Sequence, residues 1–444
     1  MIAHLALLVL SALLAPAPRS AAPPRDDVYQ KDVAFALDEL EKRCGHFFRR
    51  KDIDWNVVER EFTKEAKSVE DDEQLFVLLV RLLARLRDGH AEVRPGRAGG
   101  ELPVPEEWRK PKVGPGFFLC RSGGKLYVKS VWSTADEVGI EPGMQLVEAD
   151  GVPAAKWFEE RLAEYREHAS LSTEQHAVFA TCMWGFMGEP GERLKLELAG
   201  PEKRKKKKAT ITYHKASAFN EGPAVLLPGL EWVGDSVRYT RTEKGYGYVH
   251  VRRIREKLLE EIDTALAALA GVPGMILDFR GNTGGGCDHD ALEARFVPAG
   301  ATLPRLARAP LASAGPAPYG GPLVVIVDGT VVSAGETTAG MFMEDGRAYM
   351  IGESATAGMS SQKETIDLPS GKFALYVSVG TNRSSFNGGE GIEGIGVVPQ
   401  ELVELDPEDL AAGVDTLIRR AEELLGDFPQ EELKYDPAEY GFGR

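Results

Sequence analysis

Ser333 stands where a nucleophilic hydroxyl would be placed in an α/β protein. It follows the apolar run 323–327 and a short turn, at the expected start of a helix. A hydroxyl there lies at the positive end of the helix dipole and at the carboxyl edge of a sheet, where such proteins bind their ligands. The sequence Ser333-Ala-Gly-Glu336 also fits a capping box, in which the serine only caps the helix.

His90 and Glu393 have the types needed to assist such a serine. His90 follows an apolar helical stretch in Arg87-Asp-Gly-His90, and imidazole can take a proton from a hydroxyl near neutral pH. Glu393 lies in a glycine-rich loop, and a carboxylate can fix the tautomer of a histidine and stabilise its cation. A surface histidine and a solvated loop glutamate are the ordinary alternatives.

A glycine-rich turn could stabilise the negative charge of an acyl-transfer reaction. The buried run 275–279 continues into Arg280-Gly-Asn-Thr-Gly284-Gly285-Gly. Several backbone N–H groups of such a turn can point at one oxygen, and removing one oxyanion donor costs about 2.7–4 kcal/mol of transition-state binding. A tight connection between a strand and a helix would use the same glycines.

The surrounding sequence indicates which elements must position these groups. Residues 26–87 repeat apolar side chains at helical spacing, and a Pro- and Gly-rich stretch follows at 95–115. Short strands dominate 116–213, whereas strands alternate with helical patterns from 222 onward. The alternation predicts an α/β domain with a largely buried sheet. A closing helix is expected at 407–425.

Composition excludes several classes of protein. The 444 residues include 53 Lys and Arg against 68 Asp and Glu, a net charge of −15, with 43% hydrophobic residues. This is the profile of a globular protein, and its acidic surface disfavours nucleic acid as a partner. The one basic run, 203–208, is interpreted as a solvated hairpin turn rather than a polyanion contact.

No metal or cofactor is expected. The sequence contains no HExxH, EF-hand or Walker motif. The four cysteines, Cys44, Cys120, Cys182 and Cys287, are too widely spaced for a metal site, and the sequence leaves open whether they pair.

The N-terminus is typical of a secretory signal peptide. Residues 2–15 are apolar and are followed by Pro- and Ala-rich sequence with small residues at 20–22. Because about 20 residues are needed to cross a bilayer, we expect cleavage and export, periplasmic or secreted, with no membrane span afterwards. An uncleaved anchor is the alternative.

The order and spacing of the motifs resemble those of the serine peptidases that include the C-terminal processing (tail-specific) proteases and the tricorn core. The resemblance implies a crotonase- and ClpP-like α/β core, a PDZ-like domain and polypeptide substrates. The segments that carry it are 247–251, 276–285, 331–336, 345–347, 351–353 and 394–399.

Residues 133–153 resemble the PDZ pattern of a short helix, a Gly-Ile-x-Pro-Gly turn and a strand ending in Asp-Gly. Gly114, Gly116 and Phe117 are similar to the loop that binds a peptide carboxylate in that family, beside a sheet edge that accepts the peptide as a strand. A helical insertion is expected within 157–188. The expected segments are a signal peptide (1–22), an N-terminal helical region (25–105), the PDZ-like domain (106–215), the catalytic core (216–430) and a tail (431–444).

One departure bears on the mechanism. In the processing proteases a lysine about 25 residues after the nucleophile acts as the base, but Gly358 stands there and Lys363 falls five residues late. The tricorn-like branch uses serine, histidine and glutamate. The resemblance therefore implies Ser333 as nucleophile, His90 as base and Glu393 as its orienter. Ala334, with Gly284 or Gly285, would form the oxyanion hole.

Two other functions stay open. A binding protein with a degenerate site would explain the missing lysine. Acyl-CoA chemistry, as in crotonases, is disfavoured by the export signal and the PDZ-like segment. The sequence does not indicate the oligomeric state. Here Ala334 follows the nucleophile in place of tricorn's aspartate, and Gly89 precedes the histidine in place of a serine. These departures leave the substrate preference open.

Overall fold

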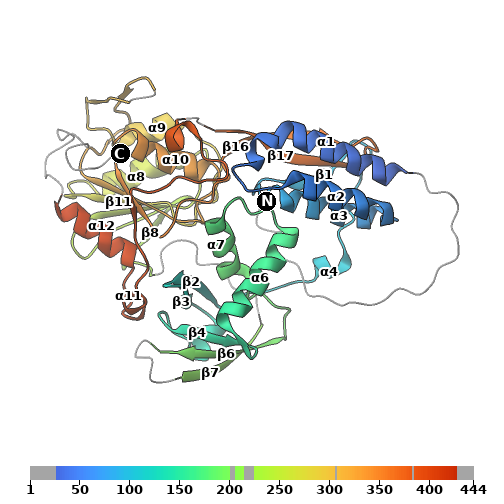
Figure 1. The fold of residues 1–444 in the computed structure, drawn as a ribbon. Helices are drawn as coiled ribbons and strands as arrows, with labels where there is room; N and C mark the ends of the chain where they lie inside the picture. Colours follow the sequence, from blue (N-terminus) through green and yellow to red (C-terminus); the bar gives the residue numbers. More distant parts are fainter. Residues whose placement is uncertain (1–26, 201–205, 215–224, 306–307, 383–384, 428–444) are drawn as a thin grey trace.

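The computed structural model describes residues 27–200, 206–214, 225–305, 308–382 and 385–427. The expected signal peptide and C-terminal tail lie outside these ranges. Three bodies are visible in Figure 1: a sheet-containing core, a group of N-terminal helices with strands against them, and a smaller body with strands and two helices.

The core is a seven-stranded sheet in the order β18-β15-β14-β11-β10-β9-β8. Five of the strands are parallel, and β9 and β8 run antiparallel at one edge. All residues of the central strands are buried, which confirms the predicted α/β core. The strands are β8 (Glu231–Val233), β9 (Val237–Arg241), β10 (Gly247–Val251), β11 (Met275–Asp278), β14 (Leu323–Val327), β15 (Tyr349–Gly352) and β18 (Glu401–Leu402).

The central strands are buried because helices cover both faces of the sheet. Val249, Leu277 and Val325 pack with helices α8 (Leu258–Ala268) and α10 (Ala334–Glu344). Their neighbours Tyr248, Ile276 and Val324 point to the other face and pack with α12 (Thr416–Asp427). Alternate side chains of each strand thus enter two separate cores. Shorter elements of the core are α9 (His289–Glu293), η2 (Ala294–Phe296), β12 (Thr302–Leu303), β13 (Leu311–Ala312) and η3 (Phe386–Gly389).

The closing helix is broken, which corrects the sequence prediction of one helix over 407–425. The chain forms α11 (Pro407–Ala411) and then α12. Gly413 between them has φ 73°, a left-handed conformation in which a helix ends.

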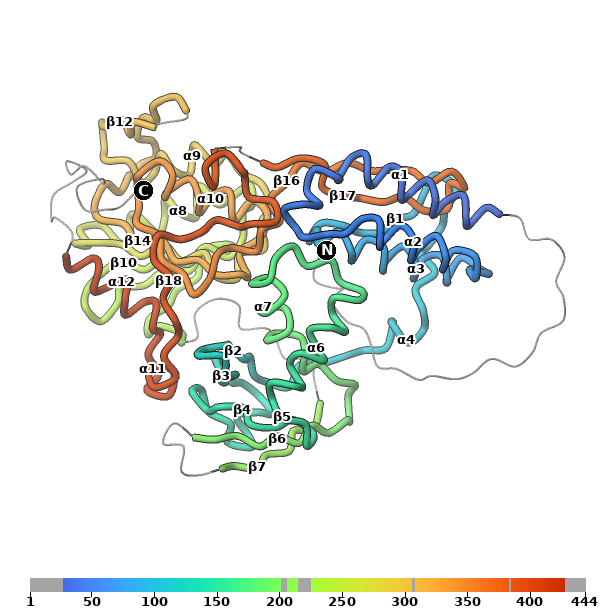
Figure 2. The backbone as a smooth tube through the Cα atoms, viewed as in Figure 1, coloured from blue at the N-terminus to red at the C-terminus, as the bar shows by residue number. Residues whose placement is uncertain are grey.

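The N-terminal helices share a core with strands from the far end of the chain. Strand β1 (Glu92–Pro95) pairs with β17 (Phe373–Thr381), which pairs with β16 (Ser361–Asp367). One hydrophobic cluster contains residues from the helices and from these strands, and Figure 2 shows β16 and β17 reaching from the core to the helices. The sequence did not indicate this pairing. The helices are α1 (Val28–Phe48), α2 (Trp55–Glu65), η1 (Ala66–Ser68) and α3 (Asp72–Arg85).

The third body is a β-sheet in the order β2-β3-β4-β6-β7 with two long helices. The helices α6 (Ala154–His168) and α7 (Glu174–Trp184) occupy the segment where a helical insertion was expected. Strand β7 pairs with β6, as the hairpin interpretation requires, but Lys206, Lys207 and Lys208 lie in β7 itself and not in the turn where they were expected. The other elements are α4 (Glu106–Arg109), β2 (Phe117–Ser122), β3 (Lys125–Val131), α5 (Thr134–Glu137), β4 (Gln145–Ala149), β5 (Val152–Pro153), β6 (Arg193–Ala199) and β7 (Lys206–Thr212).

The cysteines and the hydropathy of the helices bear on two further predictions. All four cysteines lie in described residues and none is paired; three are buried and Cys287 is half-buried. None of the helices in the described ranges is long and apolar enough to cross a membrane.

Candidate active site

Ser333 lies at the carboxyl edge of the sheet, between β14 and the start of α10, in a backbone conformation that non-glycine residues rarely adopt. Its φ and ψ are 56° and −125°. Its N–H donates to Oε2 of Glu336 at 2.9 Å, as in the predicted capping box. The cap engages the backbone of the serine, and the strained turn holds the residue at the edge of the sheet.

The structure brings His90 to this serine from the N-terminal body. Nε2 of His90 lies 3.3 Å from Oγ of Ser333, although 243 residues separate them. Asp88 shapes the loop, because its carboxylate accepts the N–H of His90 at 3.0 Å and the N–H and hydroxyl of Ser378, on β17, at 2.7 and 2.8 Å. The histidine is therefore oriented through contacts with the β16–β17 strands.

The segment after α6 also holds the histidine loop. Oγ of Ser170 accepts the N–H of Asp88 at 2.7 Å, and Oγ of Ser172 accepts the N–H of Gly89 at 2.8 Å. A Cβ on Gly89 would lie 2.7 Å from Sδ of Met359. Contacts from three bodies of the molecule therefore meet at the His90 loop.

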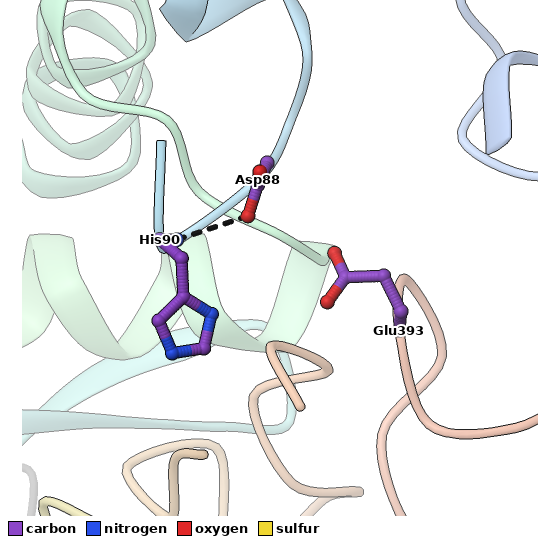
Figure 3. A group of neighbouring side chains, drawn as sticks. All are labelled: Asp88, His90 and Glu393. Carbon is purple, nitrogen blue, oxygen red and sulfur yellow. Dashed lines mark hydrogen bonds between the residues drawn. The ribbon is translucent and has the colours of Figure 1, made fainter. Parts of the chain in front are cut away.

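Glu393 is buried beside His90, but its ion-pair partner is Lys51. Its Oε1 lies 2.6 Å from Nζ of Lys51, which also donates to the carbonyl of Arg87 at 2.8 Å. One imidazole nitrogen of His90 and one carboxylate oxygen from each of Asp88 and Glu393 lie within 4.8 Å of one another (Figure 3). Within the described residues, Oε2 of Glu393 and Nδ1 of His90 are buried without a hydrogen-bond partner.

The histidine and two carboxylates are also types that can bind a metal ion. However, the oxygens of Asp88 already accept hydrogen bonds from three protein groups, and Glu393 faces an ammonium group. Lys51 also supplies positive charge where a metal ion would supply its own. We therefore interpret the cluster as one that orients and polarises a histidine.

The surroundings favour the neutral imidazole, which is the form that accepts a proton. The pKa of His90 is lowered to about 4, chiefly by burial and also by the charges of Lys363 and Lys51, while Asp88 opposes the shift. Burial raises the pKa of Glu393, and the adjacent Lys51 opposes that rise. The free histidine is thus a base at neutral pH.

The glycine-rich turn lies directly against Ser333. A Cβ on Gly284 would come 2.8 Å from Cβ of Ser333. The N–H of Gly284 is already engaged, because it donates to Oδ1 of Asn282 at 2.9 Å. Among the described residues, no acceptor is found for the N–H groups of Gly285 and Ala334.

Gly358 occupies the position where the processing proteases carry their lysine. Its N–H donates to Oε1 of Glu336 at 2.6 Å, its φ is 74°, and a Cβ there would lie 2.5 Å from Cγ2 of Thr173. The site is therefore closed to a side chain. Lys363 is half-buried on β16, opposite Ser378, and burial lowers its pKa while Asp88 and Glu393 raise it.

The predicted peptide-binding loop is packed inside the third body. Gly114, Gly116 and Phe117 are buried, and the carbonyl of Gly116 accepts the N–H of Trp132 at 2.7 Å. Strand β2, which begins at Phe117, is an edge strand, and α7 packs beside it. Peptide binding by this loop stays a prediction.

Sequence reasoning missed Lys51, and it did not assign a role to Asp88. Asp88 stood inside the quoted Arg87-Asp-Gly-His90 motif, so its position was a usable signal. Lys51 ends the basic run Arg49-Arg-Lys51, which is indistinguishable in sequence from a solvated group of charges. Only the fold brings it to Glu393.

A serine hydroxyl beside a neutral histidine, at the carboxyl edge of an α/β sheet, is the arrangement of a serine-type hydrolase. Comparison with known proteins supports this class. Residues 245–403 match the model of Peptidase family S41. The protein is a serine-type peptidase, as the sequence motifs predicted, and this segment is similar to that family.

The chain is also similar to individual proteins. The chain is 23% identical over 362 residues to the carboxyl-terminal-processing protease of Synechocystis sp., covering 79% of this chain and 75% of that protein. Mature CPAF has a similar fold, with a TM-score of 0.61 and 13% identity over 90% of this chain and 96% of that one. A putative peptidase from Parabacteroides merdae superposes with a TM-score of 0.50 and 16% identity, covering 89% and 96% of the two chains.

Proposed function

We propose that this peptidase is an exported endopeptidase in which Ser333 is the nucleophile and His90 the general base. The observation that carries the proposal is the distance of 3.3 Å between Nε2 of His90 and Oγ of Ser333. Oγ attacks the peptide carbonyl carbon while Nε2 takes its proton. The proton then passes to the leaving amine as the C–N bond breaks, and water hydrolyses the resulting ester by the same route.

Glu393 is proposed to stabilise the imidazolium that forms during these steps. Support comes from its burial and from its position within 4.8 Å of the histidine. Catalytic hydrogen bonds are often long in the free enzyme and shorten when the substrate is bound. Lys51 would hold the carboxylate in place and favour its ionised form against burial, the chief cause of its raised pKa of about 8.

The oxyanion hole is proposed to use the N–H groups of Ala334 and Gly285. The hydrogen bond from Gly284 to Asn282 argues against Gly284 as a donor. Gly284 would instead be needed for its small size, since a Cβ there would come 2.8 Å from Cβ of Ser333. Of the two glycines that the sequence left open, the proposal therefore takes Gly285.

Export and the PDZ-like domain complete the proposal. The apolar run at residues 2–15 supports a cleaved signal peptide. The edge position of β2 supports a peptide-binding role for the third body. Cell fractionation and N-terminal sequencing of the mature protein test export, and cleavage near residue 22 is expected.

Hydrolysis of an unfolded polypeptide tests the nucleophile. Purified protein should cleave casein, and Ser333→Ala should abolish cleavage at equal thermal stability. Ser133→Ala is a matched control, because exposed Ser133 has nearly the same backbone conformation, φ 53° and ψ −128°, at the start of another helix. The proposal fails if Ser333→Ala cleaves as fast as the Ser133→Ala control.

A polypeptide-binding protein without turnover is the second candidate. The direct contact of Glu393 with Lys51, together with glycine at position 358, favours it. That candidate predicts that casein binds to the wild type but stays intact. Cleavage dependent on Ser333 excludes it.

A further inference from the structure

A basic cavity lies at the same edge of the sheet as Ser333. It has a volume of about 400 Å³ and is lined by Trp232, Gly234, Asp235, Arg252, Arg253 and Arg255. Three arginines against one aspartate give it a positive charge, in a chain whose net charge is −15. Such a concentration of arginine in an acidic protein would attract an anionic group.

The topology places this cavity beside the reaction. Strands β10, β11 and β14 are parallel, so the chain leaves all three at one edge. Val251 at the end of β10 pairs with Val237, and Val237 pairs with Val233. The turn between β8 and β9 therefore lies at that edge too, next to the arginines that follow β10.

Backbone hydrogen bonds connect the arginine segment directly to the glycine-rich turn. The N–H of Ile254 donates to the carbonyl of Gly284 at 2.9 Å, and the N–H of Gly286 donates to the carbonyl of Ile254 at 2.8 Å. Gly284 in turn lies so near Ser333 that a Cβ on the glycine would come 2.8 Å from Cβ of the serine. The segment that carries the arginines thus borders the proposed oxyanion turn.

Hydrogen bonds and cation–π contacts fix the turn and the tryptophan that line the cavity. The carboxylate of Glu261, on α8, accepts the N–H groups of Ser236 and Val237 at 2.9 and 3.0 Å and fixes the turn. Trp232 is 51% exposed, and its ring lies 4.8 Å from the guanidinium of Arg238 and 5.5 Å from that of Arg252. These cation–π contacts fix the direction of the ring.

The arginines of the cavity differ in whether they have an acidic partner. Arg255 lies 3.6 Å from Asp235, an exposed pair. Arg253 is half-buried, and within the part of the chain that the structure describes it has neither an ion pair nor a hydrogen bond from its side chain. A guanidinium held in a cavity without an acidic partner is suited to a carboxylate, which it can bind with two parallel hydrogen bonds.

Resting on the proposed peptidase function, we propose that this cavity binds a carboxylate of the polypeptide substrate and thereby selects the cleavage site. Neighbouring strands are about 4.8 Å apart, so the ends of β10 and β14 are separated by roughly 10 Å and those of β8 and β14 by roughly 19 Å. An extended peptide covers about 3.3 Å per residue. The carboxylate therefore lies about three to six residues from the scissile bond.

Matched peptides test the proposal after a casein cleavage site has been mapped by mass spectrometry. A neutral peptide containing that site is compared with versions carrying one glutamate about three to six residues away, on either side, and with versions whose C-terminus is free or amidated. We expect at least one carboxylate to raise kcat/KM about fivefold to tenfold, less so at high salt. The glutamate and free-terminus series distinguish a side chain from the terminal carboxylate.

Substitutions assign the effect to the cavity. Arg253→Gln should remove the preference for the acidic peptide, and Arg253→Glu should transfer it to a peptide with lysine at the same position. Arg241→Gln is the control, because Arg241 is an exposed arginine at the opposite end of β9. The inference is overturned if the acidic and neutral peptides are cleaved equally, or if Arg253→Gln retains the full preference.

A binding measurement separates this inference from the proposed function. Ser333→Ala protein is titrated with the acidic and neutral peptides by calorimetry, in wild-type and Arg253→Gln backgrounds. Tighter binding of the acidic peptide that depends on Arg253 supports the cavity even if no hydrolysis is found. If the neutral peptide is hydrolysed and acidic peptides are not preferred, the proposed peptidase function stands and the proposed role of the cavity is overturned.

Discussion

Nζ of Lys51 lies 2.6 Å from Oε1 of Glu393, and both side chains are almost completely buried, with exposures of 1% and 0%. The pair joins the end of the first N-terminal helix to the loop that holds Glu393 in the core, 342 residues later in the chain. Through the carbonyl of Arg87, the same ammonium contacts the segment that leads to His90. The N-terminal body is therefore part of the active site.

Removing Lys51 should damage both stability and activity. Lys51→Met leaves the carboxylate of Glu393 buried without its partner, which typically costs about 3–5 kcal/mol. Urea denaturation and kcat/KM on casein-derived peptides measure the two effects. Arg50→Gln is the control, because Arg50 donates to the carbonyl of Glu393 at 3.2 Å without entering the ion pair.

A double variant separates structure from catalysis. Lys51→Met with Glu393→Gln replaces both charges, so most of the lost stability should return while activity stays low. Recovery of full activity in the double variant would mean that Glu393 does not assist His90.

Loss of the histidine should lower kcat by about 10²–10⁴-fold, the usual contribution of a general base. The protein should stay folded, since the imidazole forms few hydrogen bonds. Exposed His46 on α1 provides the control, as His46→Ala should leave hydrolysis unchanged. Unchanged hydrolysis after His90→Ala would direct attention to Lys363, whose pKa is lowered by burial.

The pH profile should reflect the buried histidine. The neutral imidazole is the active form, and burial lowers the pKa of His90 to about 4. Activity should therefore persist below pH 6, where a solvated histidine would already be protonated, and should fall as the pH approaches 4. The measurement is kcat/KM against pH with a neutral peptide, whose own charge does not change. A fall centred near pH 6.5 would show that the histidine is solvated in the free enzyme.

Substitution of Gly358 by a residue with a side chain should destabilise the protein. Gly358→Ala should destabilise the protein by about 1–3 kcal/mol or more, because its φ of 74° is strained for alanine and Cγ2 of Thr173 lies 2.5 Å from the new Cβ. Gly151→Ala measures the cost of the backbone strain alone, since Gly151 has φ 78° with open space around it. Thermal unfolding of both variants should show the larger loss at position 358. Equal losses would mean that Thr173 moves aside.

The α/β core and the peptidase class could be predicted from local sequence patterns. Strands such as Met275–Asp278 are apolar throughout because helices cover both faces, and that local pattern is readable without a structure. Ser333 and the glycine-rich turn belong to the same pattern, since both follow buried strands. The S41 match at residues 245–403 confirms the class that these motifs predicted.

The distant groups around the serine could not be identified without the folded chain. His90, Asp88 and Lys51 reach it because β1 pairs with β17 and joins the N-terminal helices to the core. Pairing between β1 and β17, which are about 280 residues apart, leaves no local periodicity in the sequence. The sequence also does not distinguish a buried lysine from a solvated one. The charge and position of each site group depend on burial and on long-range contacts, which the fold creates and the order of residues does not display.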